Sequence, residues 1–226
     1  MTRGPVATPG RSMQPPLRRR DVLAGLALAA LAGAGAAAAA EAPPALLAQV
    51  RQRLADAPVL RGEFVQRKQL KGFKNPLVSK GDFLVARDRG VVWRTREPFA
   101  SALVVTRDRL LSRQADGSVG TQVDAGREPG IRAINEMLFA LMSADLAALS
   151  QRFRIDGQLV GADGWRLALV PRDPALGQWL SRIELEGDRH VRGVRLQEAQ
   201  GDLSTITLSA QSVAPALTPE EAARFD

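Results

Sequence analysis

The chain has 226 residues, with 31 Lys or Arg against 24 Asp or Glu, and a formal net charge of +7. It contains no cysteine and one histidine, which excludes a disulfide framework and makes a transition-metal site improbable. A chain of this length can bury a core without either kind of crosslink. We therefore expect a fold that is stabilised by ordinary packing.

The first 40 residues have the pattern of an export signal. Three consecutive arginines at 18–20 precede an uncharged stretch, residues 22–40, that is rich in Ala, Leu and Gly. Small residues before Glu41 are what signal peptidase accepts, so we expect cleavage after Ala40 and a mature domain of residues 41–226. A membrane anchor is the weaker interpretation, because the stretch is only mildly apolar and has no positive flank after it.

The export route and the starting residue have alternatives. Arg19 and Arg20 followed by Asp21 partly match a twin-arginine signal, so both export systems stay open. Residues 1–12 look like extra sequence, since Met13 would give an ordinary signal by itself. Loss of the 40 residues removes five arginines and one aspartate, which lowers the net charge to +3.

A short helix followed by strands is predicted for the first half of the mature domain. Leu46, Leu47, Val50 and Leu54 fall at helical spacing, and Pro58 ends that pattern. Apolar segments between short polar or Gly/Pro breaks then predict strands at residues 59–70, 79–87, 91–96, 102–106 and 110–114. Breaks this short leave no room for crossover helices, so we expect an antiparallel sheet.

A second amphipathic helix is predicted to begin near Pro129. Its apolar side would be formed by Ile131, Ile134, Leu138, Leu141 and Met142. Met137 and Met142, the only methionines left after export, lie on this helix, and methionine packs adaptably. The plain alternative is that both methionines are ordinary core residues.

Strands are predicted to resume after this helix, at residues 153–160, 165–170, 183–186, 191–198 and 203–211. The last of these alternates, with Ile206, Leu208 and Ala210 on one face and Thr205, Thr207 and Ser209 on the other. That pattern is typical of a sheet with one buried face and one solvated face. Thr218, Pro219 and Glu221 predict a capping box on a short C-terminal helix.

Catalytic chemistry is poorly represented in the sequence. His190 lies between two predicted strands and reads as a solvated turn residue. We find no nucleophile elbow and no phosphate loop, so we expect neither an enzyme nor a cofactor. Nucleic-acid binding is not expected, because basic and acidic residues alternate. The most basic region, residues 67–74, is either a solvated hairpin end or a docking patch for an acidic partner or anionic lipid head groups.

A motif in the first strands resembles the LolA family of periplasmic lipoprotein carriers. It consists of GEFVQ at residues 62–66 and GDFLVARDRGVVW at residues 81–93, followed by Pro98. The resemblance implies that Arg87 holds a helical lid closed over a cavity. The proline that usually follows that arginine is Asp88 here. An arginine at a strand end is otherwise a solvated charge, and Pro98 is expected to set a turn between two strands.

The resemblance implies a mainly β (α+β) fold, in which a strongly curved antiparallel sheet forms an unclosed half-barrel and helices cap its concave face. Phe64, Phe83, Trp93, Phe99 and Trp165 are expected to supply large apolar side chains from the strands. The predicted lipid-binding residues of the cavity and lid are Phe64, Phe83, Arg87, Trp93, Ile134, Met137, Leu138, Leu141 and Met142.

These features favour a monomeric periplasmic carrier that binds the acyl chains of lipoproteins or a related envelope lipid and needs no cofactor. By resemblance, an inner-membrane lipoprotein-releasing transporter would load it and an outer-membrane acceptor would unload it. Two alternatives stay open. One is an envelope sensor module of lipids or lipoproteins, and the other is a specialised carrier in a lipid, glycolipid or polyene pigment export pathway.

Overall fold

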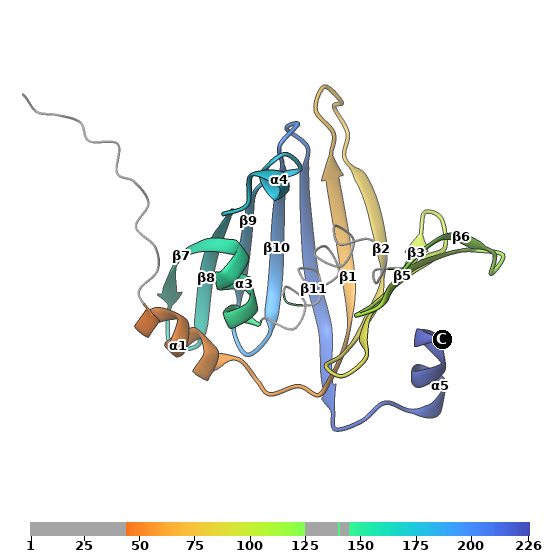
Figure 1. Cartoon of the computed structure of the whole chain (residues 1–226), viewed down its shortest axis with the longest axis horizontal. Coiled ribbons are helices and arrows are strands. Elements are labelled where there is room, and N and C mark those ends of the chain that lie inside the picture. Colours follow the sequence, from red (N-terminus) through yellow and green to blue (C-terminus); the bar gives the residue numbers. More distant parts are fainter. Residues whose placement is uncertain (1–43, 125–139, 141–144) are drawn as a thin grey trace, which may run out of the picture. The chain divides into compact units, whose positions relative to one another are not determined.

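The computed structural model describes residues 44–124, 140 and 145–226, and these form an 11-stranded antiparallel sheet with short helices (Figure 1). The strand order is β6-β5-β4-β3-β2-β1-β11-β10-β9-β8-β7. Every neighbouring pair is therefore a hairpin except β1 with β11, which joins the two halves of the chain. Strands β6 and β7 form opposite edges and do not pair, so the sheet is not closed into a barrel. This confirms the predicted fold class.

The strands follow the alternating segments of the sequence, with ends that differ from the predicted ones by a few residues. Their bounds are β1 Val59–Gln69, β2 Leu77–Ala86, β3 Gly90–Glu97, β4 Ser101–Thr106, β5 Arg109–Gln114, β6 Val119–Asp124, β7 Phe153–Val160, β8 Gly164–Pro171, β9 Leu180–Gly187, β10 Val191–Glu198 and β11 Leu203–Ala214. Strand β6 was not predicted. Pro98 lies in the connection between β3 and β4, as expected for a residue without a ladder donor.

The helices of the described residues are short. They are α1 Pro44–Arg53, α3 Leu146–Arg152, α4 Pro174–Gly177 and α5 Pro219–Ala222, and a 3₁₀ turn η1 spans Ala223–Phe225. The capping box on α5 is confirmed, because Thr218 and Glu221 exchange side-chain and backbone hydrogen bonds. Helices α3 and α4 were not predicted, although Asp145 and Asp173 cap them with side-chain hydrogen bonds.

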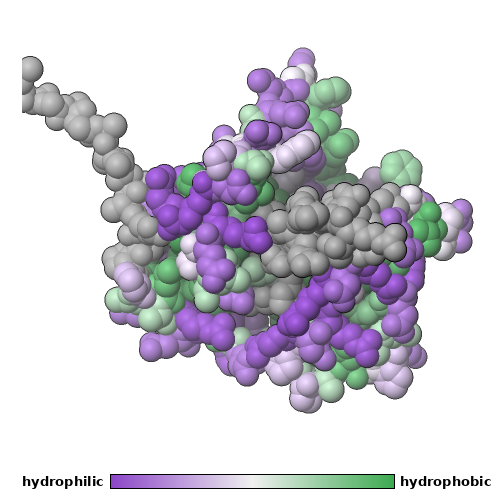
Figure 2. All heavy atoms as spheres, in the orientation of Figure 1, coloured by the Kyte–Doolittle hydropathy of each residue, from purple (hydrophilic) through white to green (hydrophobic). Residues whose placement is uncertain are grey.

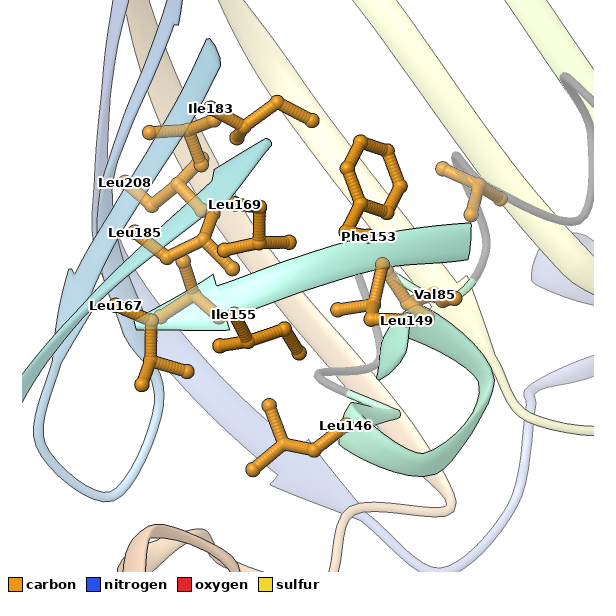
Figure 3. Packing of buried hydrophobic residues seen from close by; sticks show 14 of the residues in the cluster. Val85, Leu146, Leu149, Phe153, Ile155, Leu167, Leu169, Ile183, Leu185 and Leu208 are labelled. Atoms are coloured by element: carbon orange, nitrogen blue, oxygen red, sulfur yellow. The ribbon is translucent and has the colours of Figure 1, made fainter. Parts of the chain in front are cut away.

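One face of the sheet carries the main core together with α1 and α3. Figure 3 shows Leu146 and Leu149 of α3 beside the apolar side chains of β7 to β9, which are fully buried. Val50 of α1 belongs to the same cluster. The face on which α1 and α3 pack is called the inner face below, and the opposite face is called the outer face.

The outer face has a second, smaller core under the C-terminus. Phe225 of η1 is 3% exposed and packs on buried residues of β1 to β5. These partners are Val59, Leu84, Ala86, Val92, Val104 and Leu111. The C-terminal helix therefore packs on the outer face, whereas α1 and α3 pack on the inner face.

A bulge interrupts the predicted alternation of β11. Leu208 pairs with Phe64 and is buried, but the register between β1 and β11 shifts between Arg61 and Glu63. At this point Ala210 has φ +48° and an exposed side chain. The expectation that Ala210 shares the buried face of Ile206 and Leu208 was therefore wrong, because the extra residue of a bulge reorients the chain.

Candidate functional site

The repeated Gly-x-Phe pattern of β1 and β2 forms two reciprocal pairs on the inner face. Gly62 pairs with Phe83, and Phe64 pairs with Gly81. A Cβ added to Gly62 would lie 2.5 Å from Phe83 Cζ, and one added to Gly81 would lie 2.8 Å from Phe64 Cε1. Each phenylalanine ring therefore lies over the glycine of the other strand. A larger residue at Gly62 would displace the Phe83 ring, and one at Gly81 would first meet the backbone carbonyl of Arg94 on β3.

Trp93 of β3 extends the two phenylalanines into a three-ring cluster. Its ring centroid lies 3.8 Å from that of Phe64 and 6.1 Å from that of Phe83, with both pairs stacked. Phe64 and Phe83 are 1% and 2% exposed, whereas Trp93 is half-buried. The structure thus brings three predicted site residues together, and Trp93 is the member that a ligand on the inner face could contact.

The acidic residues of the same motif lie on the outer face. Glu63 and Asp82 stand opposite each other in the β1–β2 ladder, a like-charge pair that would be unfavourable alone. Arg94 binds Asp82 at 3.0 Å, and Arg96 binds Glu63 at 3.1 Å. The acids and arginines of this motif therefore stabilise the outer surface, while the glycines and phenylalanines shape the inner one.

Half-buried apolar side chains continue the inner face on both sides of the aromatic cluster. Leu103 of β4 pairs with Trp93, while Leu196 of β10 and Ile206 of β11 pack at the margin of the main core. All three are partly exposed, in contrast to the fully buried residues around α3 in Figure 3. The part of the inner face formed by β3, β4, β10 and β11 therefore offers apolar surface that the described residues do not fully cover.

Phe99 and Trp165 differ from the predicted pattern in different ways. Phe99 follows β3 in a connection and is 82% exposed, so the expectation that it supplies apolar bulk from a strand was wrong. Trp165 is fully buried, and its Nε1 donates to the Asp188 carbonyl at 2.7 Å. It belongs to the core and not to an accessible surface.

The predicted lid residues Ile134, Met137, Leu138, Leu141 and Met142 lie outside the described residues. So do Pro129 and Ile131, and the pocket expected beneath this helix. The lid therefore stays a prediction. Ala140 lies within the same segment of sequence, is helical and is 3% exposed in the main core cluster.

Arg87 lies directly after β2, where its backbone N–H donates to the Pro58 carbonyl at 3.0 Å. Its guanidinium is half-exposed and forms an ion pair with Asp56. It also lines a cleft of about 500 Å³ together with Leu47 of α1 and Leu146 of α3. The side chain thus stands between two helices that cover the inner face, apart from the aromatic cluster.

A second cleft of about 310 Å³ adjoins Arg87 and contains His190. His190 lies in the β9–β10 turn, as predicted, but it is half-buried and not fully solvated. Burial lowers the pKa of His190, and the nearby Arg192 lowers it further. The ring is therefore neutral at pH 7 and adds no charge beside Arg87.

The outer side of β7 to β11 has a hollow of about 720 Å³ that is lined by polar and apolar atoms in similar measure. Arg166 binds Glu186 at 3.1 Å, and Arg182 binds Glu184 at 3.0 Å within this lining. Paired charges of this kind disfavour an acyl chain, whose binding depends on apolar area. Of the two faces, the inner one suits an apolar ligand.

The described ranges contain neither a candidate metal site nor a candidate membrane-spanning helix. No group of three or more His, Cys, Asp or Glu residues there is arranged to hold a metal ion. Among the same residues, no helix is both long enough and apolar enough to cross a bilayer.

The fold is thus an unclosed antiparallel sheet whose inner face is apolar and is covered in part by α1 and α3. A sequence model of the family described as outer membrane lipoprotein carrier protein LolA matches residues 55–221. The chain therefore belongs to the LolA family, whose members are binding and carrier proteins. Among curated proteins, no sequence matches the chain.

Several solved structures have a similar backbone fold. A DUF1329 family protein from Desulfovibrio piger is 11% identical and covers 80% of this chain and 95% of its own, with a TM-score of 0.47. A LolA superfamily protein from Nitrosomonas europaea is 10% identical, with coverages of 80% and 97% and a TM-score of 0.44. A chain of the MucA/MucB complex of Pseudomonas aeruginosa is 19% identical, with coverages of 77% and 59% and a TM-score of 0.41.

Proposed function

We propose that this protein is a periplasmic carrier that binds the acyl chains of lipoproteins or of a related envelope lipid against its inner face. The observation that carries the proposal is the half-buried apolar surface around Trp93, Leu103 and Ile206 on the inner face of the sheet. Membership of the LolA family supports a carrier role. Binding and release by such a carrier require no chemical step and no cofactor.

Affinity in this proposal comes from apolar area and not from polar contacts. Burial of one methylene contributes roughly 0.8 kcal/mol, so a single acyl chain gains several kcal/mol on a surface that it covers well. The fully packed aromatic pair beneath Trp93 gives the surface a rigid floor. The predicted lid, with Ile134, Met137, Leu138, Leu141 and Met142, would close over the bound chain.

Mass spectrometry of lipid that co-purifies with the mature protein from the periplasm tests the proposal directly. We expect an acylated lipid or lipoprotein in near-stoichiometric amount. Protein that carries no acylated molecule, and that does not bind a fluorescent fatty acid afterwards, would contradict the proposal.

Two neighbouring residues of β11 provide a matched pair of variants. Ile206 is half-buried on the inner face, and Thr207 is exposed on the outer face. Ile206→Thr removes apolar contact area and should weaken binding of the fluorescent fatty acid by roughly three- to tenfold. Thr207→Ser should leave binding unchanged. Equal affinities of the two variants would show that the ligand does not contact this part of the inner face.

We further propose that Arg87 favours the closed state of the carrier by donating hydrogen bonds to the lid. Its position at a cleft between α1 and α3 supports this role. A charged donor contributes roughly 1.5 to 3 kcal/mol in such bonds, which changes the open fraction about tenfold or more. Without these bonds, bound lipid should be held but handed on poorly.

Arg87→Leu tests this role, with Arg89→Leu as the control from the same turn. Both arginines are half-exposed, and their ion pairs with Asp56 and Asp226 are surface pairs worth less than about 1 kcal/mol. Both variants should therefore fold. We expect slow transfer of a fluorescent lipid to acceptor vesicles by Arg87→Leu alone. Normal transfer, with unchanged hydrogen exchange in the lid, would show that Arg87 is only a solvated charge.

Export, location and partners complete the proposal. We propose that a signal ending near Ala40 directs residues 41–226 to the periplasm, where the domain acts as a monomer. An inner-membrane lipoprotein-releasing transporter would load it, and an outer-membrane acceptor would receive its cargo. LolA family membership supports this arrangement.

A further inference from the structure

Lysine is confined to one short segment of the chain. All four lysines, Lys68, Lys71, Lys74 and Lys80, lie within 13 residues, and every other basic residue except His190 is an arginine. This segment is the end of β1, the β1–β2 connection and the start of β2. The long hairpin therefore carries a set of flexible ammonium groups that occurs nowhere else in the sequence.

Exposed aromatic side chains gather near the same hairpin. In the described part of the chain, Phe73, Phe99 and Trp179 are 66%, 82% and 71% exposed, and all the other aromatic side chains are buried or half-buried. Leu77 and Val78 beside Phe73 are exposed as well. Large apolar side chains in water are unfavourable, and when they gather in one region they mark an interaction surface.

The three aromatic residues lie at one end of the sheet. Phe73 is in the β1–β2 connection, and Phe99 follows Glu97, which pairs with Lys80 near the start of β2. The backbone carbonyl of Trp179 accepts a hydrogen bond from the amide of Ala199, in the β10–β11 turn, at 3.0 Å. Figure 1 shows the β1–β2 hairpin, the β10–β11 turn and α4 at the same end.

At this end of the sheet, ion pairs and a hydrogen bond connect the β1–β2 hairpin to the β10–β11 turn. Lys68 binds Glu198 at 2.6 Å and reaches Asp202 at 3.7 Å, and the amide of Lys71 donates to Asp202 at 2.9 Å. The β1–β2 hairpin is therefore fastened to the β10–β11 turn. At the top of Figure 2, hydrophobic surface lies directly beside hydrophilic surface on this projection.

Among the residues that the structure describes, two of the four ammonium groups have no acidic partner. Lys68 is neutralised by the β10–β11 turn, and Lys80 binds Glu97 at 3.0 Å. Lys71 and Lys74 are exposed and form no salt bridge within the described residues. The projecting hairpin therefore presents unpaired positive charge on both sides of Phe73.

We propose that this end of the sheet docks the protein on an anionic lipid bilayer. Aromatic side chains such as Trp179 are favoured at the interface between water and lipid, and ammonium groups next to them bind anionic head groups. Phe73, Phe99 and Trp179 come from three separate connections at this end of the sheet. The inference does not depend on the proposed cargo, because it concerns how the protein reaches a membrane.

Binding of the unloaded mature protein to phosphatidylcholine vesicles, with and without phosphatidylglycerol, tests this inference. Lys71→Glu with Lys74→Glu should weaken binding to the anionic vesicles by at least about thirtyfold at low salt. Arg154→Glu with Arg195→Glu is the matched control, because it changes the net charge equally with two exposed residues of the outer face. This control variant should bind nearly as well as the unaltered protein.

Trp179 gives a second measurement that charge alone does not produce. Because Trp179 is exposed, its fluorescence should shift to shorter wavelength on anionic vesicles, and Trp179→Phe should abolish that shift. No binding to either vesicle, equal losses in the two charge variants, or no shift would each overturn the proposal. A failure here, with lipid still co-purifying, would leave the carrier function standing.

Discussion

The buried ion pair of the C-terminal helix gives a quantitative prediction for stability. Glu221 accepts from both Nε and Nη2 of Arg61, the latter at 2.6 Å, and it also accepts from the Thr218 amide at 2.8 Å. The hydrogen bonds from Arg61 hold the pKa of Glu221 at about 2, against the opposing effect of burial. The Glu221 side chain is 10% exposed and that of Arg61 is 29% exposed.

The size of the effect follows from this pKa. A fall from 4.5 to about 2 corresponds to roughly 3 kcal/mol of stability for the charged form of Glu221, or about 2 kcal/mol with solvent screening of Arg61. Because the folded-state pKa is below the unfolded one, this stability is fully present above about pH 4.5. It is lost as the pH falls from about 4.5 to about 2.

Glu221→Gln isolates the charge, because glutamine can still accept the hydrogen bond of the capping box. Urea denaturation at pH 7 should show a loss of about 2 to 3 kcal/mol, and the variant should lose less stability than the unaltered protein between pH 4.5 and pH 2. The control is Glu186→Gln, which breaks the exposed pair with Arg166 and should cost less than about 1 kcal/mol. Equal losses for the two variants, or an unaltered acid profile for Glu221→Gln, would refute the reasoning.

Three further predictions concern the outer core, the aromatic cluster and export. Phe225→Ala should cost about 3 kcal/mol in urea denaturation because the side chain is buried in the outer core, whereas Phe99→Ala should change stability by less than about 0.5 kcal/mol. Trp93→Phe should weaken fluorescent fatty-acid binding several-fold, and unchanged affinity would place the ligand elsewhere. N-terminal sequencing of periplasmic protein should begin at or near Glu41, and a product that retains residues 22–40 would contradict the signal prediction.

Local sequence pattern was enough to predict most strands and the C-terminal cap. The alternation in β11 and the Thr218 to Glu221 spacing each act within a few residues, so they can be read without the fold. Strand β6 has no such signal, because Gly120, Thr121 and Gln122 separate its two valines. It forms by pairing with β5, and pairing partners are not visible in a single sequence.

Which residues form the candidate site could be predicted from the sequence, but how they are arranged could not. Phe64, Phe83 and Trp93 were expected on the inner face, but the reciprocal fit of each phenylalanine over a glycine depends on the β1–β2 register. The exposure of Phe99 likewise depends on where β3 ends. Residues 67–74 were predicted to be a hairpin end or a docking patch, and they do include the β1–β2 connection, but the alignment of this connection with Trp179 needed the order of the strands.

The aromatic cluster contains two buried rings that pack between β1 and β2 and one half-buried ring at the surface of the inner face. This limits the positions at which binding specificity can vary. Phe64 and Phe83 are buried against glycines, so a change at either one alters the β1–β2 packing before it reaches a ligand. Trp93, Leu103 and Ile206 border the same surface but are only half-buried. Substitutions at these three positions should therefore change which acyl chains bind at little cost in stability, whereas substitutions of the phenylalanines should lose stability and binding together.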